Sequence, residues 1–250
     1  MFHYTKSEMR AIVLRQLSVD LNCKIDDFDK EDIIFCASKE NPGRRLFSRD
    51  KTHFTMLSAG KSAIVSASND IMPFLREQLT EKTPKEAFRM PFVCGIGLFF
   101  LPDLDIIKPL SPIDVYEYVL FEKSDMPCLY EFEGFGNALQ YDIKSPRPDC
   151  LAIAARHEGK IIAVASASDD CRDMWQISVE VASEHRGKGL ASYLTNALTF
   201  EIMNRGYVPY CCVSTHNIHS QRAAHRAGYE ICWTSSRSGI FEGKYTKPVY

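Results

Sequence analysis

The sequence predicts an α+β protein in two parts, and three observations support this fold class. Residues 175–206 have the pattern of a strand, a glycine-rich turn and a helix. Two further strand patterns just before them, at 150–156 and 161–167, are joined by a hairpin signal, Glu158-Gly159. Residues 1–110 mix an amphipathic helix with several short strand patterns. A chain of 250 residues suits one large domain or two modest ones.

The strand–turn–helix stretch has the clearest pattern in the chain. From residue 175 to 181 every second residue is apolar, as in a strand with one apolar face. After Gly187 and Gly189, the apolar residues from Leu190 onward recur with the period of an amphipathic helix. Arg205 in the last turn and Gly206 just after it indicate where this helix stops.

This stretch predicts an anion-binding site at the start of the helix. The first N–H groups of a helix lack partners within it, the helix dipole adds partial positive charge there, and glycines let a phosphate approach the backbone. The spacing does not fit a P-loop, and Ser192 stands where a dinucleotide-binding turn has its third glycine. A tight turn that binds no ligand is the alternative.

Two motifs in this region resemble those of the GNAT acyltransferase superfamily. Residues 186–191, RGKGLA, match its R/Q-x-x-G-x-G/A signature. Residues 217–220, NIHS, followed by 227–229, AGY, are similar to its N-x-x-S…G-F/Y segment. With Pro209 added, the pattern is most similar to the zwittermicin-resistance-type acetyltransferases. The resemblance covers roughly residues 113–250.

The resemblance implies a mixed, centrally splayed sheet flanked by helices, and acetyl-CoA as acyl donor. In the superfamily the pantetheine arm pairs with backbone that is freed where two central strands diverge, and a strand N–H commonly stabilises the oxyanion. Val181 holds that place here, and Asn217 would also cap the last helix. The positions matched to cofactor binding are Val179, Val181, Arg186, Gly187, Lys188, Gly189, Leu190, Ala191, Asn217 and Ser220.

Residues 1–110 carry no motif with a chemical interpretation. We expect helices at 7–21 and up to Leu79, the second capped by Asn69 or Asp70, and strands at 33–37, 53–57, 63–66 and 92–101. The proline-bounded segment 102–112 predicts a linker. The chain then divides into a small α+β module, 1–110, and a GNAT domain, 111–250. The module closes over the substrate, binds a partner or completes the fold, and the sequence leaves these three roles open.

The second part has its elements in the order of a complete GNAT domain. Besides the hairpin and the central stretch, we expect a strand at 115–121, one or two short helices within 125–139 and a strand at 207–215. Pro209 removes a ladder donor from the last strand, which indicates an edge, a bulge or a gap in pairing. A gap agrees with the splay that the resemblance implies.

Composition and charge narrow the classes of function. A formal net charge of −2 gives no general reason to expect nucleic acid or an anionic membrane as partner. No apolar run reaches the roughly 18 residues of a transmembrane helix, and the first residues lack a signal-peptide core. Nine cysteines without C-x-x-C spacing indicate reduced thiols in a cytoplasmic protein. Cys211 and Cys212 should point to opposite faces of their strand.

Glu180 is the candidate general base. Transfer of an acetyl group to an amine needs a base for the amine proton and donors for the oxyanion. Glu180 shares one face of the central strand with Gln176 and Ser178, directly before the glycine turn. Orientation of the substrate without catalysis is the alternative. No cysteine has a nucleophile-like context, so we expect direct attack in a ternary complex.

The sequence departs from the superfamily where the leaving thiolate would be protonated. The place that usually holds a tyrosine is Ala224, and His225 beside it would point about 100° away on a helix. Either the thiolate leaves without a dedicated acid, or another tyrosine serves, the candidates being Tyr193, Tyr210 and Tyr229. The spacing of the histidines at 216, 219 and 225 fits no metal site, and we expect no metal.

The leading hypothesis is an acetyl-CoA-dependent N-acetyltransferase that acts on a primary amine of a small molecule or peptide. A non-catalytic acyl-CoA-binding sensor or regulatory protein is the alternative, which the alanine at 224 keeps open. An interaction module whose turn binds no cofactor is a third. No pattern identifies the acceptor or the oligomeric state.

Overall fold

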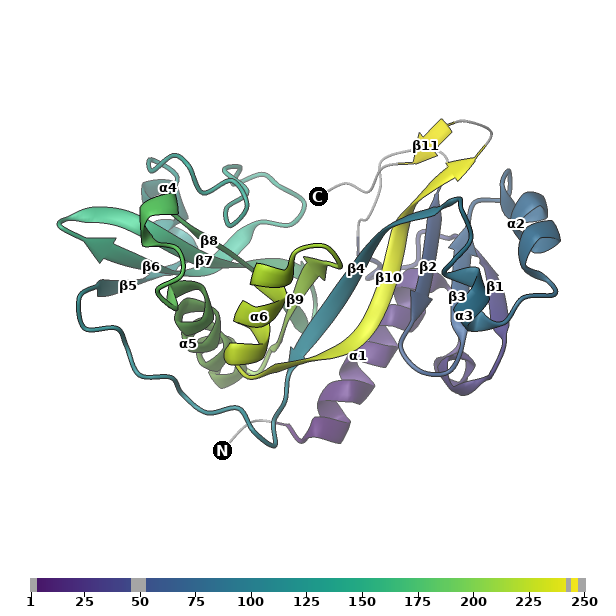
Figure 1. Cartoon of the computed structure of the whole chain (residues 1–250), viewed down its shortest axis with the longest axis horizontal. Helices are drawn as coiled ribbons and strands as arrows, with labels where there is room; N and C mark the ends of the chain where they lie inside the picture. Colours follow the sequence, from purple (N-terminus) through teal and green to yellow (C-terminus); the bar gives the residue numbers. More distant parts are fainter. Residues whose placement is uncertain (1–3, 46–52, 242–243, 247–250) are drawn as a thin grey trace. The chain divides into compact units, whose positions relative to one another are not determined.

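The computed structural model describes residues 4–45, 53–241 and 244–246, and contacts divide the chain into two compact units (Figure 1). The first comprises Met1–Met9 and Phe100–Glu230, and the second Arg10–Phe99 and Ile231–Tyr250. Helix α1 (Lys6–Leu21) and the strands β4 (Val93–Pro102) and β10 (Tyr229–Phe241) contribute residues to both. The division into domains 1–110 and 111–250 stays a prediction, whereas by contacts the end of the chain groups with residues 10–99.

The first unit contains a run of paired strands in the order β9-β8-β7-β6-β5. The pairs β5–β6, β6–β7 and β7–β8 are antiparallel and the pair β8–β9 is parallel, so the sheet is mixed. Glu158 (φ 50°) and Gly159 (φ 76°) form the predicted hairpin turn between β6 and β7. The bounds are β5 Glu117–Glu122, β6 Asp149–His157, β7 Lys160–Cys171, β8 Met174–Val181 and β9 Val208–Ser214.

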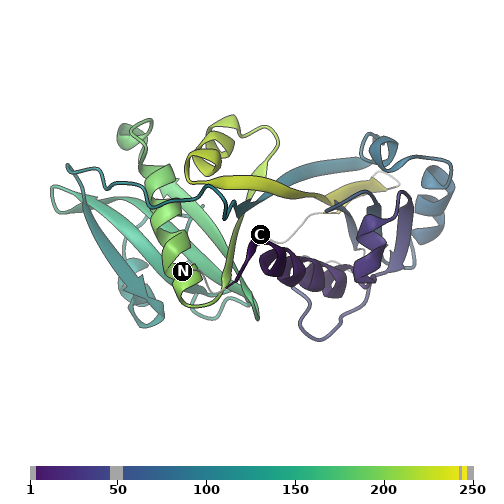
Figure 2. The same cartoon turned by 90° about the horizontal axis from the view of Figure 1, so that it is seen from below.

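Helix α5 (Leu190–Asn204) packs across this sheet, against β6, β7 and β8 (Figure 1). Its leucines at 190, 194 and 198 and Ile202 are four residues apart and buried, so one face of the helix covers the strands. Figure 2 shows the same helix, in green, crossing the teal strands. The helix ends as predicted, with Arg205 as C-cap and Gly206 at φ 85°.

The predicted order of elements in this unit is confirmed. After β5 come a short 3-10 turn (Lys123–Asp125) and α4 (Met126–Leu129), then β6, β7, β8, a second 3-10 turn (Ser183–His185), α5, β9, α6 (Ile218–Arg226) and β10. The prediction of one or two helices within 125–139 is wrong beyond the four residues of α4. Gly134 has a φ of 94°, which no helix accommodates, and the chain runs on as an irregular loop to residue 148.

The segment expected to be a linker is irregular but anchored to the first unit. Asn196 on α5 accepts from Leu110 N (2.9 Å) and donates to Lys108 O (3.1 Å) and Ala227 O (2.9 Å). Its carboxamide therefore joins residues 108–110 to the end of α6. Among the described residues, no helix is long and apolar enough to span a bilayer.

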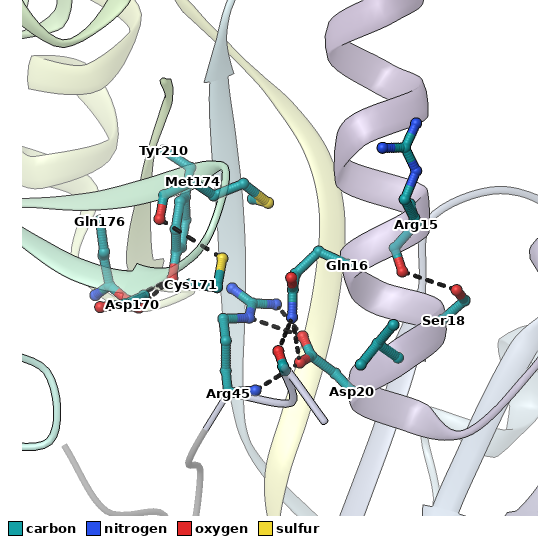
Figure 3. A network of polar contacts seen from close by, with 12 residues as sticks. Arg15, Gln16, Ser18, Asp20, Arg45, Asp170, Cys171, Met174, Gln176 and Tyr210 are labelled. Carbon is teal, nitrogen blue, oxygen red and sulfur yellow. Dashed lines mark hydrogen bonds and ion pairs between the residues drawn. The ribbon is translucent and has the colours of Figure 1, made fainter. Parts of the chain in front are cut away.

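The second unit is a smaller α+β structure with its own core. Its strands lie in the order β1-β3-β2-β10, with β1 parallel to β3 and the other pairs antiparallel. A buried ion pair between Asp20 and Arg45 (2.6 Å) ties its first helix to the chain after β1 (Figure 3). The bounds are α1 Lys6–Leu21, a 3-10 turn Ile25–Asp29, β1 Ile33–Ala37, β2 Phe54–Ser58, β3 Ala63–Ala67, α2 Met72–Leu79, α3 Pro84–Ala87 and β11 Lys244–Thr246, which pairs with β10.

The elements expected in residues 1–110 lie within one residue of their predicted ends, apart from the start of the second helix. The predicted cap at Asn69 or Asp70 is wrong, since Ile71 is the N-cap of α2 and no side chain caps it. Pro73 occupies the first turn, where its missing N–H costs nothing.

Candidate functional site

The two central strands of the first unit separate, and the separation opens the candidate site. In the described residues of β8 and β9, parallel pairing covers three residue pairs, and Gln176 with Tyr210 is the last. Residues 177–181 and 211–214 lie beyond it, on the two arms of the fork. The splay implied by the resemblance is therefore present. Pro209 does not mark the gap, because it is paired with Trp175 just before the strands part.

A buried polar cluster holds the last pair of the fork together (Figure 3). Tyr210 Oη donates to Asp170 Oδ2 (2.5 Å) and lies 3.1 Å from Gln176 Oε1. Arg147 donates from Nε to Asp170 Oδ1 (2.9 Å) and from Nη2 to Gln176 Oε1 (3.1 Å). The Asp170 side chain is only 1% exposed, so removing a partner would leave an uncompensated charge. The cluster thus fixes where β8 and β9 diverge.

The arms of the fork line a cavity of about 790 Å³. Its wall is built from β8, the glycine turn, the start of α5, β9 and α6. Lys188 is the one predicted site residue that does not line it. The predicted residues that do are Val179, Glu180, Val181, Arg186, Gly187, Gly189, Leu190, Ala191, Asn217 and Ser220.

The start of α5 is open to an anion. Gly187 (φ 77°) and Gly189 (φ 91°) adopt left-handed conformations that favour glycine, and a Cβ on Gly187 would meet nothing within 4 Å. Gly189 is the N-cap and supplies no side chain to the first N–H groups of the helix. With Arg186 on the same wall, the turn fits a pyrophosphate group.

The backbone of β8 presents donors to the gap. Ala182 donates its N–H to Ile162 O next to β7 (2.8 Å), and successive residues of a strand point their backbone groups to alternate sides. The N–H groups of Val181 and Val179 therefore point away from β7, toward the fork. Arg186 Nε donates to Val181 O (2.9 Å), which orients the guanidinium along the same edge.

Glu180 is held by a residue that the sequence analysis did not identify. Asn137 donates its backbone N–H to Glu180 Oε2 (2.8 Å) and its side-chain amide to Oε1 (2.9 Å). Asn137 also lines the cavity, so the held carboxylate and the amide lie on one wall. No local pattern indicates this pairing, because the two residues are 43 positions apart in the chain.

A buried carboxylate fixes the loop that carries Asn137. Asp149 accepts from Tyr130 Oη (2.7 Å), Gln140 N (2.7 Å) and Ser166 Oγ (3.0 Å). Burial raises the pKa of Asp149, and the three donors oppose that rise because they favour the charged form. The loop is thus tied to β6 and β7 on both sides of Asn137.

Ala224 lines the cavity, and the three tyrosines considered as substitute acids do not. The Tyr210 hydroxyl donates to Asp170 in the buried polar cluster, and the Tyr229 hydroxyl lies 2.5 Å from Thr199 Oγ1 in the core. Burial raises the pKa of Tyr229. The Tyr193 ring packs against Tyr118 at 4.5 Å between centroids. None of these hydroxyls faces the site.

Helix α6 brings further residues to the cavity, which the spacing from Asn217 could have identified. The cap itself is confirmed, because Asn217 Oδ1 accepts from Ser220 N (3.1 Å). Burial raises the pKa of the Cys211 thiol on β9, which opposes a nucleophilic role.

The cavity wall also contains residues from several elements that were not predicted as site residues. They are Asn137, Ile177, Ser178, His185, Ser192, Thr195, Cys211, Cys212, Val213, His219, Ala223, Ala224 and Arg226.

Residues 117–229 match the model of the acetyltransferase (GNAT) family. This segment includes every residue that lines the cavity. No curated protein matches the chain in sequence.

Several solved structures resemble the chain at low identity. A GNAT-family acetyltransferase from Novosphingobium aromaticivorans is 19% identical, with a TM-score of 0.44 over 57% of this chain and 63% of that one. A GCN5-related N-acetyltransferase-like protein from Streptococcus suis is 16% identical, with a TM-score of 0.42 over 71% and 72%. An aminoglycoside N-acetyltransferase in complex with CoA is 16% identical, with a TM-score of 0.34 over 50% and 93%. The chain spans less than two thirds of the length of the first of these.

Proposed function

We propose, from the GNAT fold of residues 117–229, that the protein is an acetyl-CoA-dependent N-acetyltransferase that acts on a primary amine of a small molecule or peptide. The observation that carries the proposal is one cavity shared by the uncapped start of α5, the open arms of β8 and β9, and Glu180. An anion site, backbone donors and a carboxylate base then face the same space.

The donor would lie along the fork. Arg186 and the N–H groups at Gly187 and Gly189 would hold its pyrophosphate, and the backbone of Val179 and Val181 would pair with the pantetheine arm. Acetyl-CoA supplies a thioester whose carbonyl carbon is open to attack. Asn217 and Ser220 line the same cavity from α6 and would contact the arm from that side.

Transfer would be direct. The amine nitrogen forms a bond to the thioester carbonyl carbon, the carbon–sulfur bond breaks, and its electron pair leaves on sulfur. Glu180 takes one N–H proton from the amine, and the Val181 N–H donates to the carbonyl oxygen as negative charge builds there. A thiol has a pKa of about 8.5, so the thiolate can leave and take a proton from water without an acid at Ala224.

A non-catalytic acyl-CoA sensor is the second candidate, and one observation favours it. The cavity wall has alanine at 224, and no tyrosine hydroxyl among the described residues replaces the missing acid there. A sensor would bind the donor tightly and turn over none of it.

The test is a calorimetric titration with acetyl-CoA followed by thiol release with a panel of amines. We expect Glu180→Gln to keep donor affinity and to lower turnover by about 10²–10⁴. Glu133→Gln, at an exposed position on the loop that carries Asn137, is the matched control and should behave as wild type. Unchanged turnover in Glu180→Gln would remove this residue from the mechanism. Binding without turnover by any amine favours the sensor, and no binding favours the interaction module.

Two finer proposals accompany this function. The nine cysteines lack C-x-x-C spacing, which supports a reducing compartment, the cytoplasm. Within the superfamily we place the chain nearest the zwittermicin-resistance-type acetyltransferases, on Pro209 and the Asn217-x-x-Ser220 spacing.

A further inference from the structure

We infer that Asn137 positions Glu180 and, together with it, selects primary amines by accepting the N–H that remains on the nitrogen after transfer. The inference rests on the proposed function, because it concerns the acceptor of that same reaction. It assigns a residue outside both motifs, on the irregular loop between α4 and β6.

The contact between Asn137 and Glu180 involves both carboxylate oxygens. The backbone N–H of Asn137 occupies Oε2 and its side-chain amide occupies Oε1, at 2.8 and 2.9 Å. Each oxygen keeps lone-pair capacity for one more donor, so the carboxylate is fixed in direction but still able to take a proton. A base fixed in this way need not be oriented again when the amine arrives.

The same contact fixes which way the Asn137 amide points. A carboxamide has one donor end and one acceptor end, and only the NH₂ end is attracted to a carboxylate. The carbonyl oxygen, Oδ1, must therefore point away from Glu180. Among the described residues no hydrogen bond reaches Oδ1, and Asn137 lines the cavity. Beside the proposed base there is thus an acceptor for a second N–H group.

The position of Asn137 is set by its neighbours rather than by its own side chain. Phe135, Ala138 and Leu139 are buried in the core under the loop, at 5%, 3% and 3% exposure. Ala138 N and Leu139 N both donate to Phe135 O, at 2.9 and 2.8 Å, which closes a tight turn around Asn137. The amide is therefore presented from a rigid support.

A primary amine matches two acceptors and a secondary amine does not. When the nitrogen of a primary amine attacks, one N–H proton passes to Glu180 and one N–H stays in the amide product. Asn137 Oδ1 would accept the N–H that stays. A secondary amine gives up its single N–H to the base and would place a methyl group, instead of a donor, against Oδ1, so that the hydrogen bond is lost.

The experiment compares the best primary amine of the panel with its N-methyl derivative, using the full chain. Asn137→Ala removes the carbonyl oxygen and the side-chain donor, and we expect the ratio of kcat/KM for primary over secondary amine to fall about tenfold. Asn137→Asp keeps an oxygen in the same place but repels Glu180, so we expect it to keep the ratio and lose kcat. Glu133→Ala, on the same loop, is the control and should change neither.

A purely structural role for Asn137 would lower both rates together, and a ratio within twofold of wild type in Asn137→Ala overturns the inference. Acetyl-CoA affinity is measured alongside, and it should stay at the wild-type value in all three variants. If Asn137→Ala fails to bind the donor because it does not fold, a loss of the ratio in the isosteric Asn137→Asp overturns the inference. Wild-type protein that binds the donor but acetylates no amine refutes the proposed function itself, and the inference with it.

Discussion

Replacement of Gly189 by aspartate should weaken donor binding about 100-fold while the fold survives. Gly189 caps α5 at φ 91°, and the nearest atom to an added Cβ is Ile113 Cδ1 at 3.7 Å, an ordinary contact. The left-handed backbone costs an L residue about 1–2 kcal/mol. This loss is well below the roughly 5–15 kcal/mol by which folded proteins are typically stable, so the fold should survive.

The effect on binding is electrostatic. Two unit charges about 4 Å apart repel by about 1 kcal/mol in water and about 4 kcal/mol at an effective dielectric of about 20. Between these two limits we take about 1.5 kcal/mol for each of the two pyrophosphate charges. The sum of about 3 kcal/mol corresponds to a loss of about 100-fold in affinity.

The assay is a calorimetric titration with CoA, with a thermal melt of each variant. Gly159→Asp is the control, because Gly159 has a similar φ of 76° and open space around it but lies in the hairpin turn. The loss in Gly189→Asp should shrink at high salt, which screens the repulsion. Affinity within threefold of wild type, or an equal loss in Gly159→Asp, would refute the placement of the pyrophosphate.

Two further predictions concern stability. Gly228→Ala should lower the free energy of unfolding, measured with denaturant, by about 2–4 kcal/mol, because its Cβ would lie 2.7 Å from Ile107 Cγ1. Gly134→Ala is the control, since Gly134 has a similar φ and nothing within 4 Å, and it should lose only the free energy that a left-handed backbone costs an alanine. Equal losses of stability in the two variants would contradict the close approach of Gly228 to Ile107. Burial, aided by Arg44 and Arg237, lowers the pKa of His53 from 6.5 to about 4. Between these values the unfolded chain binds the proton more readily than the folded one, so stability falls as pH falls, by up to about 3 kcal/mol. His53→Gln should flatten the dependence of the free energy of unfolding on pH between pH 7 and 4.5. An unchanged dependence in this variant would mean that another group causes it.

The local elements were predictable because their signals lie within a few residues of one another. Helix α5 needed only the four-residue spacing from Leu190 and the stop at Gly206. The helix prediction is wrong over residues 130–139, because the apolar residues there anchor the chain to the core in an irregular path with a left-handed Gly134. Apolar spacing alone does not distinguish such a loop from a short helix.

In the candidate site, too, some features follow from the local sequence and others depend on contacts between distant segments. The glycine turn and the cap at Asn217 follow from the sequence, because each is a backbone requirement of a few consecutive residues. The fork was implied by resemblance, but its position was not. Tyr210 and Asp170 meet there from strands 40 residues apart.

The sequence by itself determined the α+β class, the order of the elements in the first unit and the glycine turn before α5, all of which depend on short-range periodicity and on glycine conformation. Only the tertiary structure decided that Asn137 holds Glu180, that Lys188 lies off the cavity wall, and that the tyrosines considered as acids are occupied elsewhere. The physical reason is that these outcomes depend on how buried side chains fill space between distant segments, and a pairing of residues 137 and 180 leaves no trace in the local pattern of either.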